Sequence, residues 1–275
     1  MRSLKPAIAS LANLVGLGLG YIYVGRIRAA LLLFFCLVGI VALASWSGLI
    51  FDPVGIYIVV AAVVLVGLFP FVHCLFIAIR EKSAPKKFYN VWWFYALWII
   101  VPWVLNQNLL DARSVLFGYE PFNVPSTSMS PTLQQGDFIM VDTWSFKESG
   151  VEVGDIFVFT LNDEFGSKYV KRIIGLPGDT IELNDGRLLR NGQVVIEPHI
   201  APRDSAKGYG RDFSQVLLGE EHYYVLGDNR AFSRDSRYLG PISEEQLHGK
   251  VRLRWFSYDN GVRWDRFPFV FDKSD

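Results

Sequence analysis

Two residues of this chain could together perform nucleophilic catalysis: a serine in a hydroxyl-rich turn and a lysine in an apolar strand. Ser128 lies in residues 124–141, VPSTSMSPTLQQGDFIMV, which begin near a proline and run into a Gly-Asp turn. A serine attacks a carbonyl only if a base removes its proton and hydrogen-bond donors hold the oxyanion that forms. Lys171, within residues 169–179, YVKRIIGLPGD, is the candidate base.

The neighbours of these two residues favour the same pairing. Ser126 precedes Ser128 by two positions, and residues two apart in an extended chain project on the same side. Lys171 is flanked by valine and isoleucine, and burial lowers the pKa of a lysine so that it can act as a base near pH 7. Residues 227–237, GDNRAFSRDSR, follow a predicted strand and could supply the groups that hold the lysine in place.

No rival nucleophile or metal system is evident in the sequence. Both cysteines, Cys36 and Cys74, lie in apolar runs, where packing residues are expected. The sequence has no His-Glu-x-x-His motif, no Gly-x-Ser-x-Gly elbow and no glycine-rich phosphate loop. We therefore expect no cofactor and no metal ion.

The elements that must position the pair are short strands. Beyond residue 110, apolar alternations are broken by Gly, Asp, Asn and Pro, which predicts a mainly β domain over residues 111–275. Asp185-Gly186 and Asn191-Gly192 are signals for hairpin turns. The expected strands are residues 137–142, 155–160, 169–174, 179–183, 223–226 and 249–255.

Residues 1–110 have a different composition. The chain of 275 residues is 51% hydrophobic, and the apolar residues are concentrated in this part. Three runs, residues 29–51, 54–79 and 88–110, are each long enough to cross a hydrocarbon core of roughly 30 Å as a helix. We therefore expect three transmembrane helices within residues 29–110 and contact with the lipid bilayer. The formal net charge is zero, which gives no indication of nucleic-acid binding.

Basic residues predict the orientation of these runs. They stand on both sides of residues 6–24 and again in residues 80–87, and the positive-inside rule places all three groups in the cytoplasm. Residues 6–24 could be a fourth span, a re-entrant hairpin or an interfacial helix. An even number of crossings, most simply zero, fits the charges. We therefore expect residues 1–28 to be re-entrant or interfacial and residues 111–275 to lie outside the cytoplasm.

The motifs of the β part resemble those of bacterial type I signal peptidases, the membrane-bound Ser/Lys leader peptidases. Residues 124–133 are similar to the family's Pro-Ser-x-Ser-Met-x-Pro-Thr-Leu box, and residues 169–179 to its Lys-Arg-x-x-Gly-x-Pro-Gly-Asp box. Residues 227–240 are similar to its Gly-Asp-Asn-Arg-x-x-Ser-x-Asp-Ser-Arg box. The resemblance covers about residues 120–266. It implies N-terminal transmembrane helices followed by a mainly β catalytic domain with the signal-peptidase-like all-β fold.

The resemblance implies catalytic roles for four residues. Ser128 is the expected nucleophile and Lys171 the expected general base. Ser233 is expected to hydrogen-bond the lysine amine and orient it. The backbone N–H of Ser128 and the hydroxyl of Ser126 are expected to form the oxyanion hole.

The resemblance also implies structural and binding roles around this pair. Ion pairs are expected between Asp235 and Arg237 and between Arg172 and Asp228. One departure is Phe232, which stands where the family usually has asparagine, just before the orienting serine. The residues that match the family's substrate cleft are Phe122, Val124, Pro125, Met129, Leu133, Tyr169 and Val170.

These expectations combine into one function. The chain is predicted to be a membrane-bound serine endopeptidase that cleaves N-terminal signal peptides from exported preproteins at the outer, periplasmic or extracytoplasmic, face of the bacterial cytoplasmic membrane. The alternative is a catalytically silent, membrane-anchored peptide-binding protein. A self-cleaving Ser/Lys repressor is disfavoured because such proteins are soluble and cut a small dipeptide, typically Ala-Gly, which this chain lacks.

Overall fold

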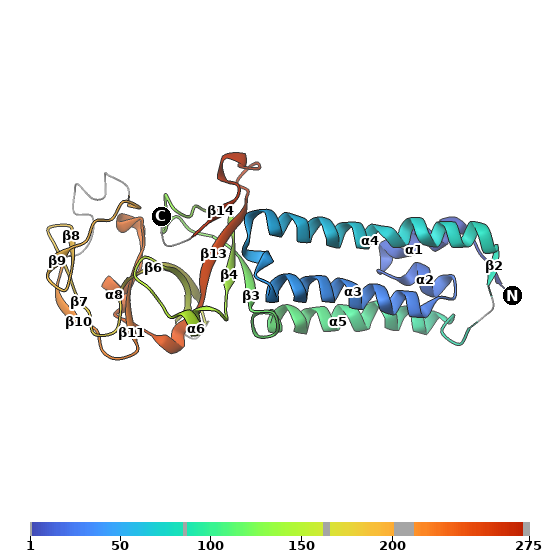
Figure 1. Ribbon diagram of the computed structural model, residues 1–275, viewed down its shortest axis with the longest axis horizontal. Helices are drawn as coiled ribbons and strands as arrows, with labels where there is room; N and C mark the ends of the chain where they lie inside the picture. Colours follow the sequence, from blue (N-terminus) through green and yellow to red (C-terminus); the bar gives the residue numbers. More distant parts are fainter. Residues whose placement is uncertain (1, 85–86, 162–165, 201–211, 272–275) are drawn as a thin grey trace. The chain divides into compact units, whose positions relative to one another are not determined.

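The computed structural model describes residues 2–84, 87–161, 166–200 and 212–271. The chain divides into two compact units, Met1–Phe117 and Gly118–Asp275. Figure 1 shows long helices in the first unit and strands in the second. The predicted fold class, apolar N-terminal helices followed by a mainly β domain, is confirmed.

Three long helices make up most of the first unit: α3 (Ile27–Trp46), α4 (Pro53–Glu81) and α5 (Trp92–Leu116). At about 1.5 Å per residue, each is long enough to match a hydrocarbon core of roughly 30 Å. The helices α3 and α4 are long and apolar enough to cross a membrane, whereas the apolar stretch of α5, Trp92–Val104, is shorter. The helix α5 continues past residue 110, where the sequence turns polar.

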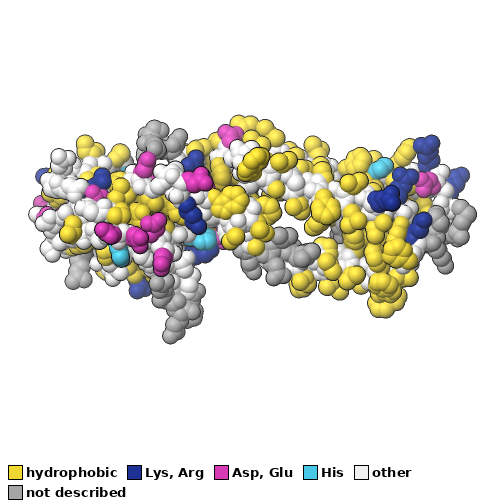
Figure 2. Space-filling view, turned by 60° about the horizontal axis from the view of Figure 1, so that its bottom comes forward, with side chains coloured by type: hydrophobic (Ala, Val, Ile, Leu, Met, Phe, Trp, Pro, Cys, Tyr) yellow, Lys and Arg dark blue, Asp and Glu magenta, His cyan; other side chains and the backbone are white. Residues whose placement is uncertain are grey.

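The surface of this unit is apolar. Large side chains of α3 and α4 remain exposed, among them Leu32, Leu65 and Val72 at 67–71%. On the face drawn in Figure 2, hydrophobic side chains cover much of the unit, while Lys and Arg side chains gather at the end that holds the N-terminus in Figure 1. A continuous apolar surface with cations at one end is typical of helices that lie in lipid.

A capped turn joins α3 to α4. The short 3₁₀ helix η1 (Leu49–Phe51) leads into Asp52, whose carboxylate accepts hydrogen bonds from the backbone N–H groups of Val54 and Gly55 at 3.0 and 2.6 Å. Pro53 occupies the first helical position, where its missing N–H costs nothing.

The N-terminal segment forms two short helices, α1 (Pro6–Val15) and α2 (Leu19–Tyr23). Neither approaches the roughly 20 residues that a membrane-spanning helix needs. The side-chain oxygen of Asn13 stabilises the link between the two helices. It accepts hydrogen bonds from the backbone N–H groups of Gly18 and Gly20 at 3.2 and 3.1 Å. The two-residue strands β1 (Arg2–Ser3) and β2 (Ser83–Ala84) pair beside the start of this segment. Residues 85–86 of the predicted cytoplasmic loop lie outside the described residues.

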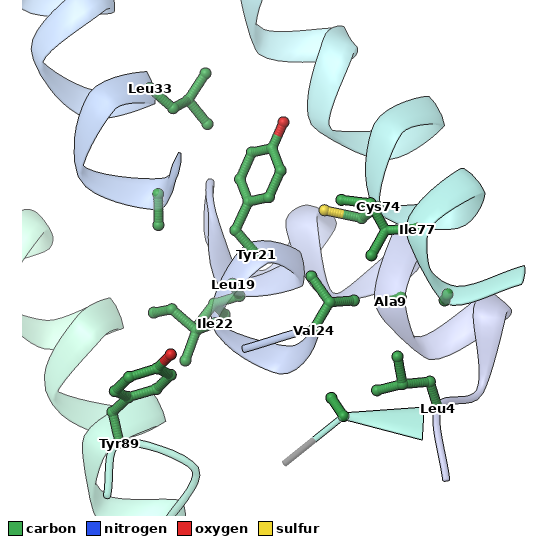
Figure 3. Packing of buried hydrophobic residues seen from close by; sticks show 13 residues of the cluster. Leu4, Ala9, Leu19, Tyr21, Ile22, Val24, Leu33, Cys74, Ile77 and Tyr89 are labelled. Carbon is green, nitrogen blue, oxygen red and sulfur yellow. The ribbon is translucent and has the colours of Figure 1, made fainter. Parts of the chain in front are cut away.

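The segment is packed into the helical unit. In Figure 3, Leu19, Tyr21 and Ile22 of α2 lie between α3, which carries Leu33, and α4, which carries Cys74. The Tyr21 hydroxyl is 2.8 Å from Nδ1 of His73 on α4. The segment thus contributes buried side chains to the core of the helical unit.

The second unit contains two antiparallel sheets. The eight-stranded sheet has the order β12-β11-β6-β5-β13-β4-β3, and β14 pairs with β13. The four-stranded sheet has the order β10-β7-β8-β9. The strands of the larger sheet are β3 (Tyr119–Asn123), β4 (Asp137–Asp142), β5 (Ile156–Thr160), β6 (Lys168–Gly175), β11 (His222–Leu226), β12 (Ile242–Ser243), β13 (Leu247–Ser257) and β14 (Phe269–Val270). Those of the smaller sheet are β7 (Thr180–Asn184), β8 (Arg187–Arg190), β9 (Gln193–Val194) and β10 (Phe213–Leu217).

Both predicted hairpin turns are confirmed in the smaller sheet. Asp185 and Gly186 join β7 to β8 with φ of 50° and 70°, and Asn191 and Gly192 join β8 to β9 with φ of 54° and 76°. Two successive residues with positive φ match the right-handed twist of the flanking strands.

Short helical turns link the remaining strands. They are α6 (Phe146–Ser149), η2 (Arg230–Phe232), α8 (Ser236–Leu239), η3 (Glu244–Gln246) and η4 (Trp264–Arg266). Strands β4, β5 and β13 bury one apolar cluster, and β5, β6 and β11 bury a second. The middle of β6 is therefore held rigidly between packed layers.

Candidate active site

Ser128 and Lys171 lie side by side although they come from different elements. Ser128 occupies the turn between β3 and β4, and Lys171 lies in the middle of β6. The Lys171 Nζ is 2.8 Å from the Ser128 Oγ and also donates to the carbonyl oxygen of Val170 at 2.8 Å. The two side chains are therefore within direct proton-transfer distance.

The surroundings of Lys171 favour its neutral form. The residue is only 3% exposed. Burial lowers the pKa of Lys171 to about 8, while the carboxylates of Asp235 and Asp228 oppose this lowering and Arg237 adds to it. A lysine with such a pKa is substantially neutral at mildly alkaline pH and can accept a proton from a serine hydroxyl.

The turn that carries Ser128 is anchored on both sides. Its ends are tied together by backbone hydrogen bonds from Val124 to the Asp137 carbonyl and from Gly136 to the Val124 carbonyl, at 2.8 and 2.9 Å. Met129 lies directly beside Ser128 in the sequence and is 1% exposed, in the cluster beneath β4 and β5. The serine is thus presented by a turn whose apolar side chains are fixed in the core.

A second loop holds this turn from the other side. The backbone N–H of Asn229 donates to the Ser128 carbonyl at 3.1 Å, and the Asn229 side chain donates to the Thr127 carbonyl at 3.0 Å. Asn229 belongs to one of the three motifs, but no role was predicted for it from the sequence. Its position next to Asp228 in the Gly-Asp-Asn-Arg motif is the only signal that could have suggested one.

Both expected ion pairs are present and buried. Arg172 donates to the two carboxylate oxygens of Asp228 at 2.9 and 2.8 Å, and Arg237 donates to those of Asp235 at 2.8 Å each. Asp235 also accepts from the backbone N–H of Gly227 at 2.9 Å. These bidentate pairs fix the second loop against β6.

The other two residues expected to act in catalysis lie near the pair. The Ser126 hydroxyl is exposed and lies 3.3 Å from the Ser128 Oγ. The Ser233 hydroxyl is buried and, within the described residues, makes no hydrogen bond, so the expected bond to Lys171 is not formed here. The side chain of Phe232, which stands where the family usually has asparagine, is 71% exposed.

The residues expected to line the substrate cleft divide into two groups. Val124, Met129 and Leu133 are 0–3% exposed and belong to the core beneath the turn. The remaining members keep exposed surface: Phe122, Pro125, Tyr169 and Val170. The Tyr169 ring stacks on Phe159 with 5.8 Å between centroids.

Sequence reasoning also missed the contacts to Thr132. Its hydroxyl donates to Asp228 at 2.5 Å, and its carbonyl oxygen accepts from Arg254 and Arg266 at 3.0 and 3.2 Å. Both arginines follow the three motifs in the chain, and no local pattern marks them. Across the described residues, no group of three or more His, Cys, Asp or Glu side chains is arranged to hold a metal ion.

Comparison with known proteins identifies a family. The model of the family "Signal peptidase, peptidase S26" matches residues 92–256. A signal peptidase I from Bacillus licheniformis is 38% identical over 186 residues, which cover 66% of this chain and 96% of that protein. Signal peptidase IB from Staphylococcus aureus (strain COL) is 35% identical over 175 residues, covering 58% of this chain and 91% of that one. The crystal structure of a signal peptidase I from Enterococcus faecalis V583 covers 36% of this chain and 95% of its own, with 33% identity and a TM-score of 0.34.

The family model and the curated relatives define a peptidase class. The chain belongs to the signal peptidase family, peptidase S26, and is a hydrolase. The resemblance inferred from the three motifs is thereby confirmed.

Proposed function

We propose that this chain is a membrane-bound serine endopeptidase that removes signal peptides from exported preproteins with a Ser128–Lys171 dyad. The family supports cleavage of signal peptides from preproteins. The observation that carries the finer assignment is the 2.8 Å separation of Lys171 Nζ from Ser128 Oγ. A catalytically silent peptide-binding protein would have no need for a buried lysine amine beside a serine hydroxyl.

The proposed reaction uses Lys171 twice. The neutral amine takes the proton of the Ser128 hydroxyl as Oγ bonds to the scissile carbonyl carbon. The resulting ammonium gives that proton to the leaving amine as the peptide bond breaks, which leaves an acyl-enzyme on Ser128. Lys171, neutral again, takes a proton from water as the hydroxide adds to the ester carbonyl carbon. The resulting ammonium returns that proton to Ser128 Oγ as the ester bond breaks, which releases the acid product and restores both side chains.

Hydrogen-bond donors for the oxyanion are proposed from the same turn. Within the described residues, the backbone N–H of Ser128 makes no hydrogen bond that would compete with an oxyanion. The Ser126 hydroxyl lies close to Ser128 Oγ and is free to turn toward the same position. One such donor contributes on the order of 10²–10³ in rate. We propose that the buried Ser233 hydroxyl turns to Lys171 when the amine becomes charged.

The substrate is proposed to bind as an extended strand. Strand β3 stands at the end of its sheet, and within the described strands the first half of β6 pairs only with β5. Open strand edges bind peptides by main-chain hydrogen bonds, with alternate side chains facing the protein. The residue before the cut and the one two positions earlier would then face the protein near Phe122 and Tyr169, and we expect a small side chain to be required before the cut.

The helical unit is proposed to anchor the enzyme in the bacterial cytoplasmic membrane. The helices α3, α4 and α5 are the proposed spans, and residues 1–28 the re-entrant segment. The charges of residues 80–87 favour a cytoplasmic position for that loop, with residues 111–275 on the periplasmic or extracytoplasmic side. The lipid bilayer and exported preproteins are the proposed partners, and nucleic acid is not.

Cleavage of a preprotein tests this proposal. The full chain in a nonionic detergent should release a mature protein whose N-terminus is one residue after an alanine, and the matched Ser128→Ala variant should release none. Substrates with phenylalanine before the cut should react about 10- to 100-fold more slowly than those with alanine. Binding without cleavage by the wild-type chain would favour the silent receptor.

A further inference from the structure

A cavity of about 520 Å³ lies in the β unit and borders the Ser128 turn at Pro131 and Thr132; its lining residues take no part in the proposed reaction. Its polar wall holds the cations Arg172, Lys250, Arg254 and Arg266, and its apolar wall includes Phe269 and Phe271. A volume of this size is typical of sites for small molecules. The acidic lining residues are Glu152 and Asp155.

Two of the four cations form ion pairs with buried carboxylates. Arg172 forms its bidentate pair with Asp228, and the Lys250 Nζ lies 2.6 Å from Asp155. These pairs are buried, so neither cation is available to a ligand without leaving a carboxylate unpaired. Of the remaining two arginines, Arg266 is also paired, with Asp137, so Arg254 is the lining cation without an ion-pair partner among the described residues.

Those two arginines belong to a cluster around Asp137 that also includes Arg263. Asp137 is fully buried and accepts from Arg266 at 2.6 Å and from Arg263 at 3.2 Å. Arg254 packs beside this cluster and is 8% exposed, but it has no carboxylate within ion-pair distance in the described part of the chain. Asp137 thus pairs with two of the three guanidinium groups, and the third, that of Arg254, has no ion-pair partner among the described residues.

Arg254 is held so that one side of its guanidinium remains unused. Its Nε donates to the Arg266 carbonyl at 2.9 Å, and its Nη1 donates to the Thr132 carbonyl at 3.0 Å. No described residue accepts from its Nη2, and the guanidinium lies over the Phe269 ring at 5.2 Å. A buried guanidinium with free donors and no counter-ion is the usual mark of a site for a phosphate or carboxylate.

A second unsatisfied group borders the same cavity. The Nε2 of His199 is buried and makes no hydrogen bond in the described part of the chain. It lies 3.7 Å from the nearest oxygen of Asp228, too far for a hydrogen bond. The cavity thus combines an unneutralised arginine, an unsatisfied imidazole nitrogen and two phenylalanine rings.

We propose that this cavity binds a small organic phosphate, with the phosphate on Arg254 and Arg266 and an apolar portion against Phe269 and Phe271. An anionic phosphate group supplies the counter-charge that Arg254 lacks, and its oxygens accept hydrogen bonds from guanidinium donors. The phosphate could belong to a free ester or to a lipid headgroup, since both present the same chemistry. Both arginines also hold the Thr132 carbonyl, so the ligand would sit directly behind the turn that carries Ser128.

Val153 offers a matched pair of variants for the test. It lines the cavity and is half-buried, so a longer polar side chain can be accommodated without disturbing the core. Val153→Glu brings a negative charge to the cavity, whereas Val153→Gln adds nearly the same volume without charge. Calorimetric titration of phenyl phosphate into the full chain in dodecyl maltoside, at constant ionic strength, measures the Kd directly and independently of peptide cleavage.

We expect saturable binding to wild type and to Val153→Gln, and at least about tenfold weaker binding to Val153→Glu. Arg254→Gln should weaken binding by a similar factor, while Arg187→Gln, which removes an exposed cation from β8, should leave the Kd unchanged. Inorganic phosphate should bind more weakly than phenyl phosphate because it lacks the apolar portion.

Competition between lipid nanodiscs and phenyl phosphate distinguishes a lipid headgroup from a free phosphate ester as the natural ligand. If anionic phosphatidylglycerol discs compete with phenyl phosphate and zwitterionic discs do not, the natural ligand is a lipid headgroup; if neither competes, it is a free ester. The proposal is overturned if wild type shows no saturable binding, or if the two Val153 variants bind phenyl phosphate equally. Should Arg254→Gln fail to fold, the Val153 pair still decides the outcome.

Discussion

Gly227 packs against the backbone of Ser128 so closely that a β-carbon at position 227 would lie 2.5 Å from the Ser128 carbonyl oxygen. The same β-carbon would also overlap the Ser233 hydroxyl. The glycine therefore permits the second loop to reach the turn that carries the proposed nucleophile, and Asn229 completes that contact.

Gly227→Ala should accordingly disable the site. The added methyl must displace the Ser128 backbone or the loop, and a misplacement of about 1 Å can cost on the order of 10²-fold in kcat/KM. Gly219→Ala is a matched control, because its β-carbon would meet only His222 Nδ1 at an ordinary 3.6 Å. Steady-state cleavage of a preprotein by both variants provides the comparison. Near-normal activity of Gly227→Ala would show that the contact is not required.

The pH dependence of cleavage should follow Lys171. Burial lowers the pKa of this lysine to about 8, and only the neutral amine can accept the serine proton. The value of kcat/KM should therefore fall about tenfold per pH unit below pH 8 and level off above it. A profile from pH 6 to 10, with a substrate that has no titrating group near the cut, measures this. An acid limb near pH 6 would point to a histidine base instead.

The second loop should depend on its buried ion pair rather than on the side chain at position 232. Arg237→Ala leaves Asp235, which is fully buried, without a cation, and should lower the free energy of unfolding by about 3–5 kcal/mol. Phe232→Asn changes an exposed residue and should stay within about 0.5 kcal/mol and keep its activity. Urea unfolding of the full chain in detergent measures both.

One result would contradict the expectation that Phe232 is compatible with activity. Wild-type protein that cleaves no preprotein, together with an active Phe232→Asn variant, would mean that this departure from the family pattern has silenced the enzyme. The 71% exposure of the phenylalanine leads us to expect the opposite.

The orientation of the helical unit is predicted from its cationic end. A reporter that is active only outside the cytoplasm should be silent when fused after Lys87 and active when fused after Gly118. A fusion after Asp52, in the turn between α3 and α4, should also be active because one span precedes it. The reverse pattern would contradict both the orientation and the proposed role in export.

Much of the β unit could be predicted because its signals are local. Alternating apolar residues located β4 and β6 within a residue or two, and the Asp-Gly and Asn-Gly pairs located both hairpins. Strand β13 begins at Leu247, two residues before the predicted strand, and directly follows the 3₁₀ turn η3. Strand β3 escaped prediction because Pro121, which is tolerated only in edge strands, interrupts its pattern.

The site could be predicted only as far as its motifs reach. Ser128 and Lys171 each stand in a recognisable sequence motif. Their close approach in space, however, depends on how β6 packs against the turn that carries Ser128. The contacts of Asn229 with Thr127 and of Arg254 with Thr132 join residues 102 and 122 positions apart, and no local pattern encodes them. The burial of Met129 likewise depends on the whole core.

The central claim is that Ser128 and Lys171 act as one catalytic unit, and a double-mutant comparison tests it most directly. Single-turnover cleavage of a preprotein should be measured for Ser128→Ala, Lys171→Met and the double variant; methionine keeps the apolar stem of the lysine and removes its amine. Each single variant should lose about 10⁴-fold or more in rate, and the double variant should be little slower than either. A Lys171→Met enzyme that cleaves at close to the wild-type rate, or losses that multiply in the double variant, would contradict the dyad.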